Sequence, residues 1–418
     1  LARFGNDIAV RSITRNAQGM SQRSGWQAVD TGQRMLRFAW QSASRGAADG
    51  YFSVEGGLAP LVVFGRSDPQ HPQARAFESL LADEGPGVRR AFEAVPWVRH
   101  AVVRKVWPNR LVVAPMCQYS CTDGLAADWH LTHWTNLLNS GCGLMIIEAT
   151  AVTPEGRITP QCLGLWDDTT AHALSDVLAR ARRLAPPTPV CIQLAHSGRK
   201  GSSAQPWKGG QLLSHSDGGW TTLAPSPLPQ LPGEVLPTEL DHAGLVRIRD
   251  AFAAAAQRAE QAGIDAIELH GAHGYLLHEF LSPISNQRTD AYGGSFEGRT
   301  RFVKEVFEAV RSAFSGVLGI RLSATDWVEG GWDPAQTLAL CEWLKGAGVN
   351  YLHISSGGIS PQQKIPIGPG YQVSLAQQVK AATGVPTIAV GLITDPHQAE
   401  AVLTQGEADA VALGRGFL

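Results

Sequence analysis

Short apolar runs recur through the second part of the chain, and amphipathic stretches separate them. From residue 109 onward there are eight such runs: NRLVVAPM, GLMIIEAT, PVCIQLAH, DAIELHGA, GVLGIRLSA, YLHISSGG, PTIAVG and DAVALGRG. Runs that are apolar on both faces are typical of buried parallel strands, because helices cover both sides of such a sheet. Eight strands that alternate with helices predict an α/β domain with the (β/α)8 TIM barrel fold.

The stretches between the runs have the periodicity of helices. The clearest cover residues 243–262, 297–314 and 334–346, and glycine closes several of them before the next strand. No helical pattern follows the eighth run, so we expect the barrel, residues 105–418, to be truncated after strand 8 and to lack its final helix. The longest gap, between the third and fourth runs, is rich in Trp, Pro, Gly and Ser, and predicts an irregular loop that controls access to the barrel mouth.

Residues 1–104 have a different pattern. They hold thirteen arginines and no lysine, and small or polar residues interrupt every helical or strand period. Weak periodicity allows a short helix over residues 74–83 and a short strand in VPWVRHAVV. We assign no fold to this extension, and two interpretations stay open: a disordered segment, and a sequence that is not native to the barrel. The first residue is not Met, and we expect a fragment.

Composition narrows the class of partner. The 418 residues are 44% hydrophobic and 17% charged, which is enough to bury a large core. A formal net charge of -2 gives no electrostatic reason to expect nucleic acid or an anionic membrane as a partner, so we expect small molecules. The six cysteines show no paired spacing, which favours a reducing, cytoplasmic location. No apolar run approaches the roughly 18 residues of a membrane span.

In a TIM barrel the active site is built from residues that follow the carboxyl ends of the strands. Those positions give the following candidates: Pro115, Met116, Cys117, Ala149, Gln193, Lys200, His270, His273, Tyr275, Arg321, Gly391, Gly414 and Arg415. Glycines and an arginine after the last strands suit a phosphate, because glycine lets backbone N–H groups approach and arginine adds a charged fork. We therefore expect a phosphorylated cofactor across the mouth, with Gln193 and Arg321 facing a ring that becomes anionic when reduced.

Three histidines, His270, His273 and His278, follow the fourth run closely. They could bind a metal, polarise a substrate or satisfy one another. The three-residue spacing of the first two, on a strand end and loop, does not make them converge as an i, i+4 pair on a helix does. No carboxylate at a neighbouring strand end completes a ligand set, so we predict no metal and regard a metal hydrolase as the weaker alternative.

Residues 109–418 resemble the Old Yellow Enzyme family of FMN-dependent ene-reductases, in particular its bacterial subgroup with a cysteine near the flavin. The matching stretches follow the family's order: APMCQYS, DWHLTHW, EATAVTPEGRITP, IQLAHSGRK, ELHGAHGYLLHEFLSPISNQRTDAYGGS, RLSATDW, GPGYQV, AVGLIT and ALGRGF. The resemblance implies tightly bound FMN, NADPH or NADH as the hydride donor, and reduction of the activated C=C bond of α,β-unsaturated carbonyl or nitro compounds.

The resemblance also implies a role for each candidate residue. Those that would bind the flavin are Pro115, Met116, Cys117, Ala149, Gln193, Arg321, Gly391, Gly414 and Arg415, the last three at its phosphate. His270 and His273 would hold the substrate oxygen, and Tyr275 would protonate the carbon opposite the hydride. Tyr119 and Lys200 would shape the substrate pocket, while His278 would be structural.

One alternative function stays open. Members of the family continue after the eighth strand with a helix and a tail, which can send an arginine into a neighbouring subunit's site. Without them, the chain would be an incomplete FMN-binding barrel with impaired catalysis, and we do not expect a homo-oligomer. Larger relatives carry an iron–sulfur cluster, but the six cysteines lack the spacing that such a cluster needs, so we predict the simple reductase.

Overall fold

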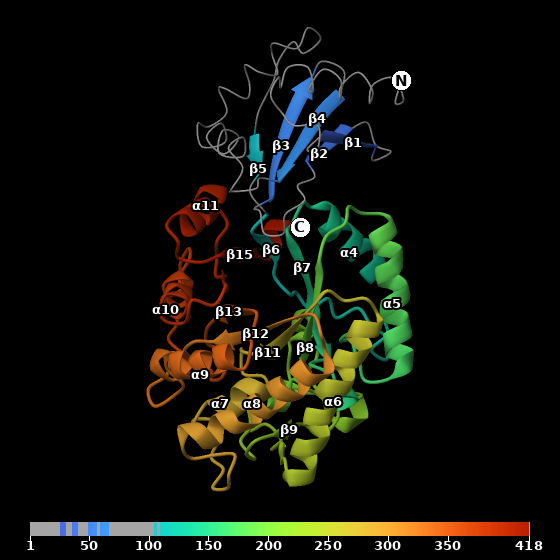
Figure 1. Ribbon diagram of the computed structural model, residues 1–418. Coiled ribbons are helices and arrows are strands. Elements are labelled where there is room, and N and C mark those ends of the chain that lie inside the picture. The colour runs from blue at the N-terminus through green and yellow to red at the C-terminus, as the bar shows by residue number, and fades with distance from the viewer. Residues whose placement is uncertain are drawn as a thin grey trace. The chain divides into compact units, whose positions relative to one another are not determined.

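The computed structural model describes residues 26–30, 36–40, 49–56, 59–66, 104–106 and 109–417. The chain divides into two compact units, Leu1–Asn109 and Arg110–Leu418 (Figure 1). Within the described ranges, no helix combines the length and the apolar composition that a membrane span requires.

Eight parallel strands close into a barrel in the second unit. They are β6 (Leu111–Val113), β7 (Leu144–Ala151), β8 (Val190–Ala195), β11 (Ala266–Gly271), β12 (Val317–Ser323), β13 (Tyr351–Ser355), β14 (Thr387–Ala389) and β15 (Ala410–Leu413). The order around the barrel is β11-β12-β13-β14-β15-β6-β7-β8, and β15 pairs with β6. Each strand overlaps one of the eight predicted runs, so the prediction of a TIM barrel is confirmed.

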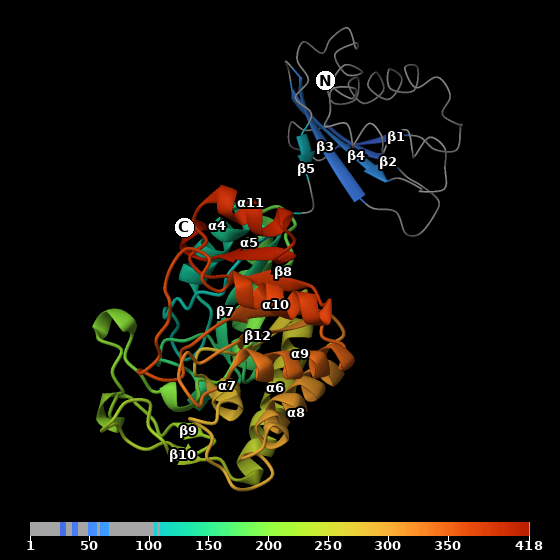
Figure 2. The ribbon, with the colours of Figure 1, turned by 90° about the vertical axis from the view of Figure 1, so that its left-hand side faces the viewer.

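Helices surround the strands (Figures 1 and 2). They are α4 (Asp128–Asn139), α5 (Asp168–Arg183), α6 (His242–Gln261), α7 (Leu276–Leu281), α8 (Phe296–Ala313), α9 (Pro334–Gly346), α10 (Val373–Thr383) and α11 (Pro396–Thr404). The three helices predicted from periodicity, α6, α8 and α9, agree with the prediction to within one residue at each end. A preceding Asp or Ser side chain accepts a backbone N–H at the start of α5, α6, α8, α9 and α11, which explains where these helices begin.

The core has two parts. The larger one lies between strands and helices, where residues such as Ile248, Phe252 and Phe302 are fully buried. Burial of each such side chain contributes roughly 1.5–3 kcal/mol. A smaller cluster, which includes Cys191, Ala266 and Tyr351, is formed by residues of the barrel strands and of the positions directly after them. These three residues lie near the amino ends of their strands, away from the mouth.

The long connection between β8 and α6 is irregular, as predicted. Over residues 201–241, here called the mouth loop, it contains two 3₁₀ turns, Pro206–Lys208 and His215–Asp217, and one short parallel pair. That pair joins β9 (Leu223–Ala224) to β10 (Thr238–Glu239).

Five strands are described in the first unit: β1 (Trp26–Asp30), β2 (Leu36–Trp40), β3 (Asp49–Gly56), β4 (Ala59–Arg66) and β5 (Arg104–Val106). They form one sheet in the order β1-β2-β4-β3-β5. The sequence pattern predicted no fold here. The helix predicted over residues 74–83 and the strand in VPWVRHAVV lie outside the described residues, and the origin of residues 1–104 stays a prediction.

Candidate active site

β11 brings three predicted site residues together at the barrel mouth. The His270 ring centroid lies 5.3 Å from that of His273 and 4.8 Å from that of Tyr275, and both contacts are edge-to-face. His273 has a φ of 60°, a left-handed conformation that is uncommon outside glycine. Gly274 follows with a φ of 77°, and a Cβ there would lie 2.2 Å from the Gly358 carbonyl oxygen. A tight turn therefore makes the three rings converge.

The two imidazoles are neutral at neutral pH. Burial and the nearby Arg321 charge hold the pKa values of His270 and His273 well below the usual range. Each ring therefore has one N–H to donate and one nitrogen that accepts. The Nδ1 atom of His270 is buried and has no partner. Burial also raises the pKa of Tyr275 well above its usual value, so the phenol keeps its proton.

Ser355, at the end of β13, contacts His273 directly. Its Oγ lies 2.6 Å from His273 Nε2, and the His273 backbone N–H donates to Ser323 Oγ at 3.0 Å. The Ser355 contact fixes the orientation of the ring, and the backbone hydrogen bond holds the turn. The other ring nitrogen, Nδ1, is left for a ligand. The sequence pattern included Ser355 only as part of the SSGG run and did not predict this contact.

The Lys200 side chain contacts the turn at His273. Its ammonium donates to the His273 and Gly358 carbonyl oxygens at 2.9 and 3.0 Å, and it lies 5.3 Å from the Tyr275 ring centroid. Burial lowers the pKa of Lys200 to about 8. Lys200 therefore connects the loops after β11 and β13, and its predicted contact with substrate stays a prediction.

Cys117 and Tyr119 lie in the loop after β6. Burial raises the pKa of Cys117 well above its usual value, and the nearby Cys162 and Glu148 raise it further. The thiol therefore stays protonated. Tyr119 has a φ of 49°, and its ring packs edge-on against Trp207 at 5.8 Å between centroids. The Tyr119 carbonyl oxygen accepts a hydrogen bond from Gln205 Nε2 at 3.0 Å, so this loop contacts the mouth loop.

β7 carries a bulge at Glu148. Ile147 pairs with Ile192, but Ala149 pairs with the next residue, Gln193. The extra residue turns Glu148 away from the ladder, and its Oε2 accepts the Gln118 backbone N–H at 2.7 Å. The bulge therefore fixes the loop after β6 and sets Ala149 opposite Gln193.

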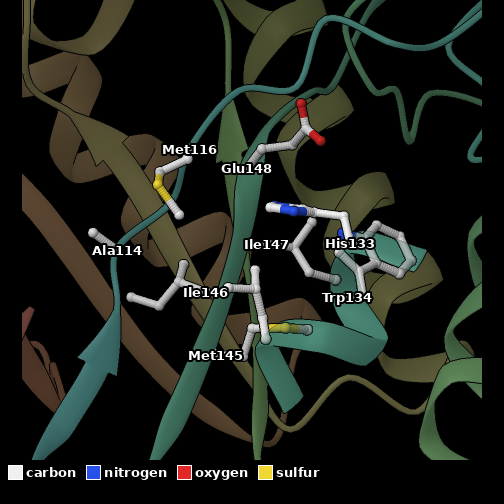
Figure 3. Close-up of a pocket in the computed structure, with 9 residues that line it drawn as sticks. Ala114, Met116, His133, Trp134, Met145, Ile146, Ile147 and Glu148 are labelled. Atoms are coloured by element: carbon white, nitrogen blue, oxygen red, sulfur yellow. The ribbon is translucent and has the colours of Figure 1, made fainter. Parts of the chain in front are cut away.

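A small pocket lies beside this bulge (Figure 3). Residues of β7, of α4 and of the loop after β6 line it, among them Met116, His133 and Glu148. Its volume of about 10 Å³ leaves room for roughly one water molecule, so it is too small for a cofactor.

Gln193 and Arg321 occupy neighbouring parts of the barrel interior. Gln193 is buried on β8, and its Nε2 donates to Glu268 Oε1 at 2.7 Å. Arg321 on β12 stands in register with His270 on β11 and His353 on β13. Its Nε atom is buried without a partner, so a donor remains free for a ligand at the mouth.

Glycines follow strands β14 and β15 at the barrel mouth. Gly391 follows β14 with a φ of 127°, and a Cβ there would lie 2.8 Å from Gln372 Nε2. Gly414 follows β15, and a Cβ there would lie 3.3 Å from Met116 Sδ. Arg415 is exposed and begins the next turn, Arg415–Phe417. Pro115, in the loop after the adjacent strand β6, is half-buried.

This arrangement fits FMN. The unpartnered Nε donor of Arg321 lies on β12, and glycine backbone follows β14 and β15, so a ring and a phosphate each find matching groups. His278, in contrast, has partners on both ring nitrogens: Nδ1 accepts from Gly274 N–H at 2.9 Å, and Nε2 lies 2.9 Å from Asp326 Oδ1. It is fully buried, which supports its predicted structural role. In the part of the chain that the structure describes, no three His, Cys, Asp or Glu residues are grouped as metal ligands.

Comparisons with known proteins agree with the geometry. The family model described as "NADH:flavin oxidoreductase / NADH oxidase family" matches residues 103–418. An NADH:flavin oxidoreductase of Gibberella zeae is 45% identical over 331 residues, which cover 74% of this chain and 79% of the relative. An NADPH dehydrogenase of Bacillus pumilus is 41% identical over 325 residues, which cover 77% of this chain and 90% of the relative.

Solved structures share the barrel. Morphinone reductase aligns with a TM-score of 0.60 and 29% identity, covering 74% of this chain and 82% of that chain. An Old Yellow Enzyme homologue from Zymomonas mobilis has a TM-score of 0.60 at 24% identity, a likeness of fold alone, covering 73% of this chain and 84% of that chain.

Proposed function

The chain belongs to the NADH:flavin oxidoreductase / NADH oxidase family, the Old Yellow Enzyme family, and on this premise we propose that it is an ene-reductase. It is an NAD(P)H-dependent flavin oxidoreductase whose cofactor is FMN. The proposed substrates are small molecules with an activated C=C bond, namely α,β-unsaturated carbonyl or nitro compounds. The observation that carries the proposal is the convergence of His270, His273 and Tyr275.

The two neutral imidazoles hold the substrate oxygen. Reduced FMN, when bound, would supply a hydride to the β-carbon, and negative charge would then develop on the carbonyl or nitro oxygen. N–H donors that are already in place stabilise that charge without reorganisation, and removal of one such donor typically costs roughly 2.7–4 kcal/mol, or about 100- to 1000-fold in rate. The left-handed turn at His273 and its contact with Ser355 keep the second donor in position.

Tyr275 supplies the proton. Its phenol stays protonated because burial raises its pKa, so the O–H is available to the α-carbon as the hydride reaches the β-carbon. The edge-to-face contact with His270 keeps the Tyr275 ring beside the oxygen-binding pair.

The proposed cofactor contacts divide between ring and phosphate. Pro115, Met116, Cys117, Ala149, Gln193 and Arg321 would contact the flavin ring. Gly391, Gly414 and Arg415 would bind the phosphate. The positive charge of Arg321 would stabilise the reduced, anionic ring, and the neutral Cys117 thiol would contact it without adding charge. Lys200 and Tyr119 would border the substrate. A cytoplasmic location is also proposed, and the six free cysteines support it.

An absorption experiment tests this proposal. The purified protein should show a bound-flavin spectrum that NADPH bleaches without oxygen and that cyclohexenone then restores. Bleaching without restoration by any enone or nitroalkene would contradict the proposed substrate class. A flavin spectrum that neither NADPH nor NADH bleaches would favour the alternative, an FMN-binding barrel with impaired catalysis.

A further inference from the structure

A charged group lies inside the barrel below the proposed flavin contacts. Glu268 precedes His270 by two residues on β11, so both side chains point to the same face of the sheet, into the barrel. Glu268 and His353 are both 0% exposed, and Glu268 Oε2 lies 2.9 Å from His353 Nδ1. The interior of a TIM barrel is ordinarily packed with branched apolar side chains, so a carboxylate there needs an explanation.

Three donors converge on this carboxylate. Gln193 Nε2 donates to Oε1 at 2.7 Å, and the Tyr351 hydroxyl donates to Oε2 at 3.3 Å, beside His353. Room for the Tyr351 ring depends on Gly319, where a Cβ would lie 2.2 Å from the ring. Four barrel strands thus contribute to one polar cluster.

The carboxylate is ionised at neutral pH. Burial alone would raise the pKa of Glu268, but the hydrogen bonds from His353 and Gln193 and the charge of Arg321 outweigh it and hold the pKa below its usual value. Burial lowers the pKa of His353, which makes the imidazole neutral and places its proton on Nδ1, toward Glu268. The cluster therefore holds one negative charge, and Arg321 is the cation that interacts with it.

This charge acts on Gln193 and Arg321, two of the six residues proposed to contact the flavin ring. Its hydrogen bond turns the Gln193 amide so that Nε2 points to Glu268, which leaves Oε1 and the second N–H for the ring. The negative charge of Glu268 also offsets part of the positive charge of Arg321. A buried ion set of this kind seldom adds net stability, because desolvation offsets the Coulomb attraction, so a role in function accounts for it better.

We propose that Glu268, held by His353, is a positioning residue that sets the reduction potential of the bound FMN. By orienting Gln193 and offsetting Arg321, its carboxylate makes the anionic reduced flavin less favourable than Arg321 alone would make it. The inference rests on the proposed function only for the position of the flavin over Gln193 and Arg321.

The test is the midpoint potential of the holoenzyme, titrated without oxygen against a reference dye and without any alkene. Glu268→Gln keeps the size of the side chain and removes its charge, so the potential should become more positive. The matched control is Asp326→Asn, which removes the carboxylate of another fully buried pair with a 2.9 Å contact, that of His278 and Asp326. Both variants should melt at a lower temperature, but only the first should shift the potential. An unshifted potential in Glu268→Gln, or an equal shift in both, overturns the inference.

Two further variants keep the inference testable. If Glu268→Gln binds no FMN, the potentials of His353→Leu and His353→Gln decide the question. The leucine removes the donor that helps to keep Glu268 ionised, so the carboxyl group should take up a proton and the potential should rise. The glutamine can still donate to Glu268, so its potential should stay near that of wild type. Equal potentials in both overturn the inference.

Arg321→Gln separates failure of this inference from failure of the proposed flavin position. If the flavin ring lies over Arg321, the midpoint potential of Arg321→Gln should be lower than that of wild type. A lowered potential there, together with an unshifted Glu268→Gln, contradicts only the role of Glu268. Unshifted potentials in both contradict the flavin position itself.

Discussion

On one side of the barrel mouth, β8, β11, β12 and β13 contribute large ionisable or polar side chains, whereas glycines follow β14 and β15 on the other side. We call these the ionisable side and the glycine side. The ionisable side depends on buried groups whose charge states are shifted by their surroundings, among them His270, Lys200 and Glu268. The glycine side depends on backbone shape, together with the exposed Arg415 that is proposed to bind the phosphate. Changes of charge at buried groups should therefore act on the ionisable side, and added Cβ atoms on the glycine side.

Removal of a donor on the ionisable side should have the largest effect. His270→Ala should lower kcat/KM for an enone by about 100- to 1000-fold, because one positioned donor to the substrate oxygen is lost. The flavin absorbance per protein should be unchanged. His172→Ala, on the exposed surface of α5, is the matched control and should keep wild-type activity. An activity loss below about fivefold for His270→Ala would be too small for an oxygen-binding donor.

Glu279 should make stability depend on pH on the same side. Glu279 is fully buried on α7. Its Oε1 accepts a hydrogen bond from the Arg199 backbone N–H at 2.8 Å, and its Oε2 has no partner. Burial raises its pKa from 4.5 to about 8. Because the folded-state pKa is the higher one, its stabilising contribution is complete below about pH 4.5 and is lost as the pH rises toward 8. At about 1.36 kcal/mol per pKa unit, the free energy of unfolding should change by a few kcal/mol across this range.

Urea unfolding at several pH values between 5 and 8 measures this contribution. The free energy of unfolding of the wild type should fall across the window, and Glu279→Gln, which imitates the protonated form, should have a flatter profile. Glu400→Gln, on the exposed face of α11, should reproduce the wild-type slope. The same slope in Glu279→Gln and wild type would show that Glu279 does not titrate in this range.

The glycine side should respond to a single methyl group. Gly391→Ala combines a φ of 127° with a Cβ that would lie 2.8 Å from Gln372 Nε2. Strain of about 1–3 kcal/mol should weaken FMN binding by about 5- to 150-fold, while kcat per bound flavin stays near wild type. Gly406→Ala also has a positive φ, of 73°, but its Cβ meets no atom within 4 Å, so FMN affinity should not change. Equal FMN affinities in wild type and Gly391→Ala would refute a close approach there.

The smallest expected effect concerns the orientation of His273. Ser355→Ala removes the hydroxyl 2.6 Å from His273 Nε2 and should lower kcat by roughly 3- to 12-fold, the value of one ordinary hydrogen bond. Ser356→Ala is the control, because Ser356 donates to Gln372 Oε1 at 2.7 Å and has no contact with His273. If both variants lower kcat equally, the effect does not come from His273.

Periodicity and strand-end positions predicted the barrel and much of its mouth. The apolar runs located all eight barrel strands, and the positions at the strand ends selected His270 and Arg321 as candidate site residues. The sequence could not predict contacts across strands, because the registers of β11 with β12 and of β12 with β13 decide that Glu268 meets His353, and these residues are far apart in the chain. The bulge at Glu148 and the turn at His273 depend on local backbone geometry that no residue pattern specifies. The sheet of the first unit was missed, because polar and small residues hid the strand period.

The central claim is that His270 and His273 stabilise the oxygen of an activated alkene while flavin supplies hydride. The most direct measurement is the rate at which cyclohexenone reoxidises the flavin after chemical reduction with dithionite in the absence of oxygen. In the double variant His270→Ala/His273→Ala, with FMN bound, this rate should fall by at least about 1000-fold. A reoxidation rate equal to that of wild type would contradict the claim.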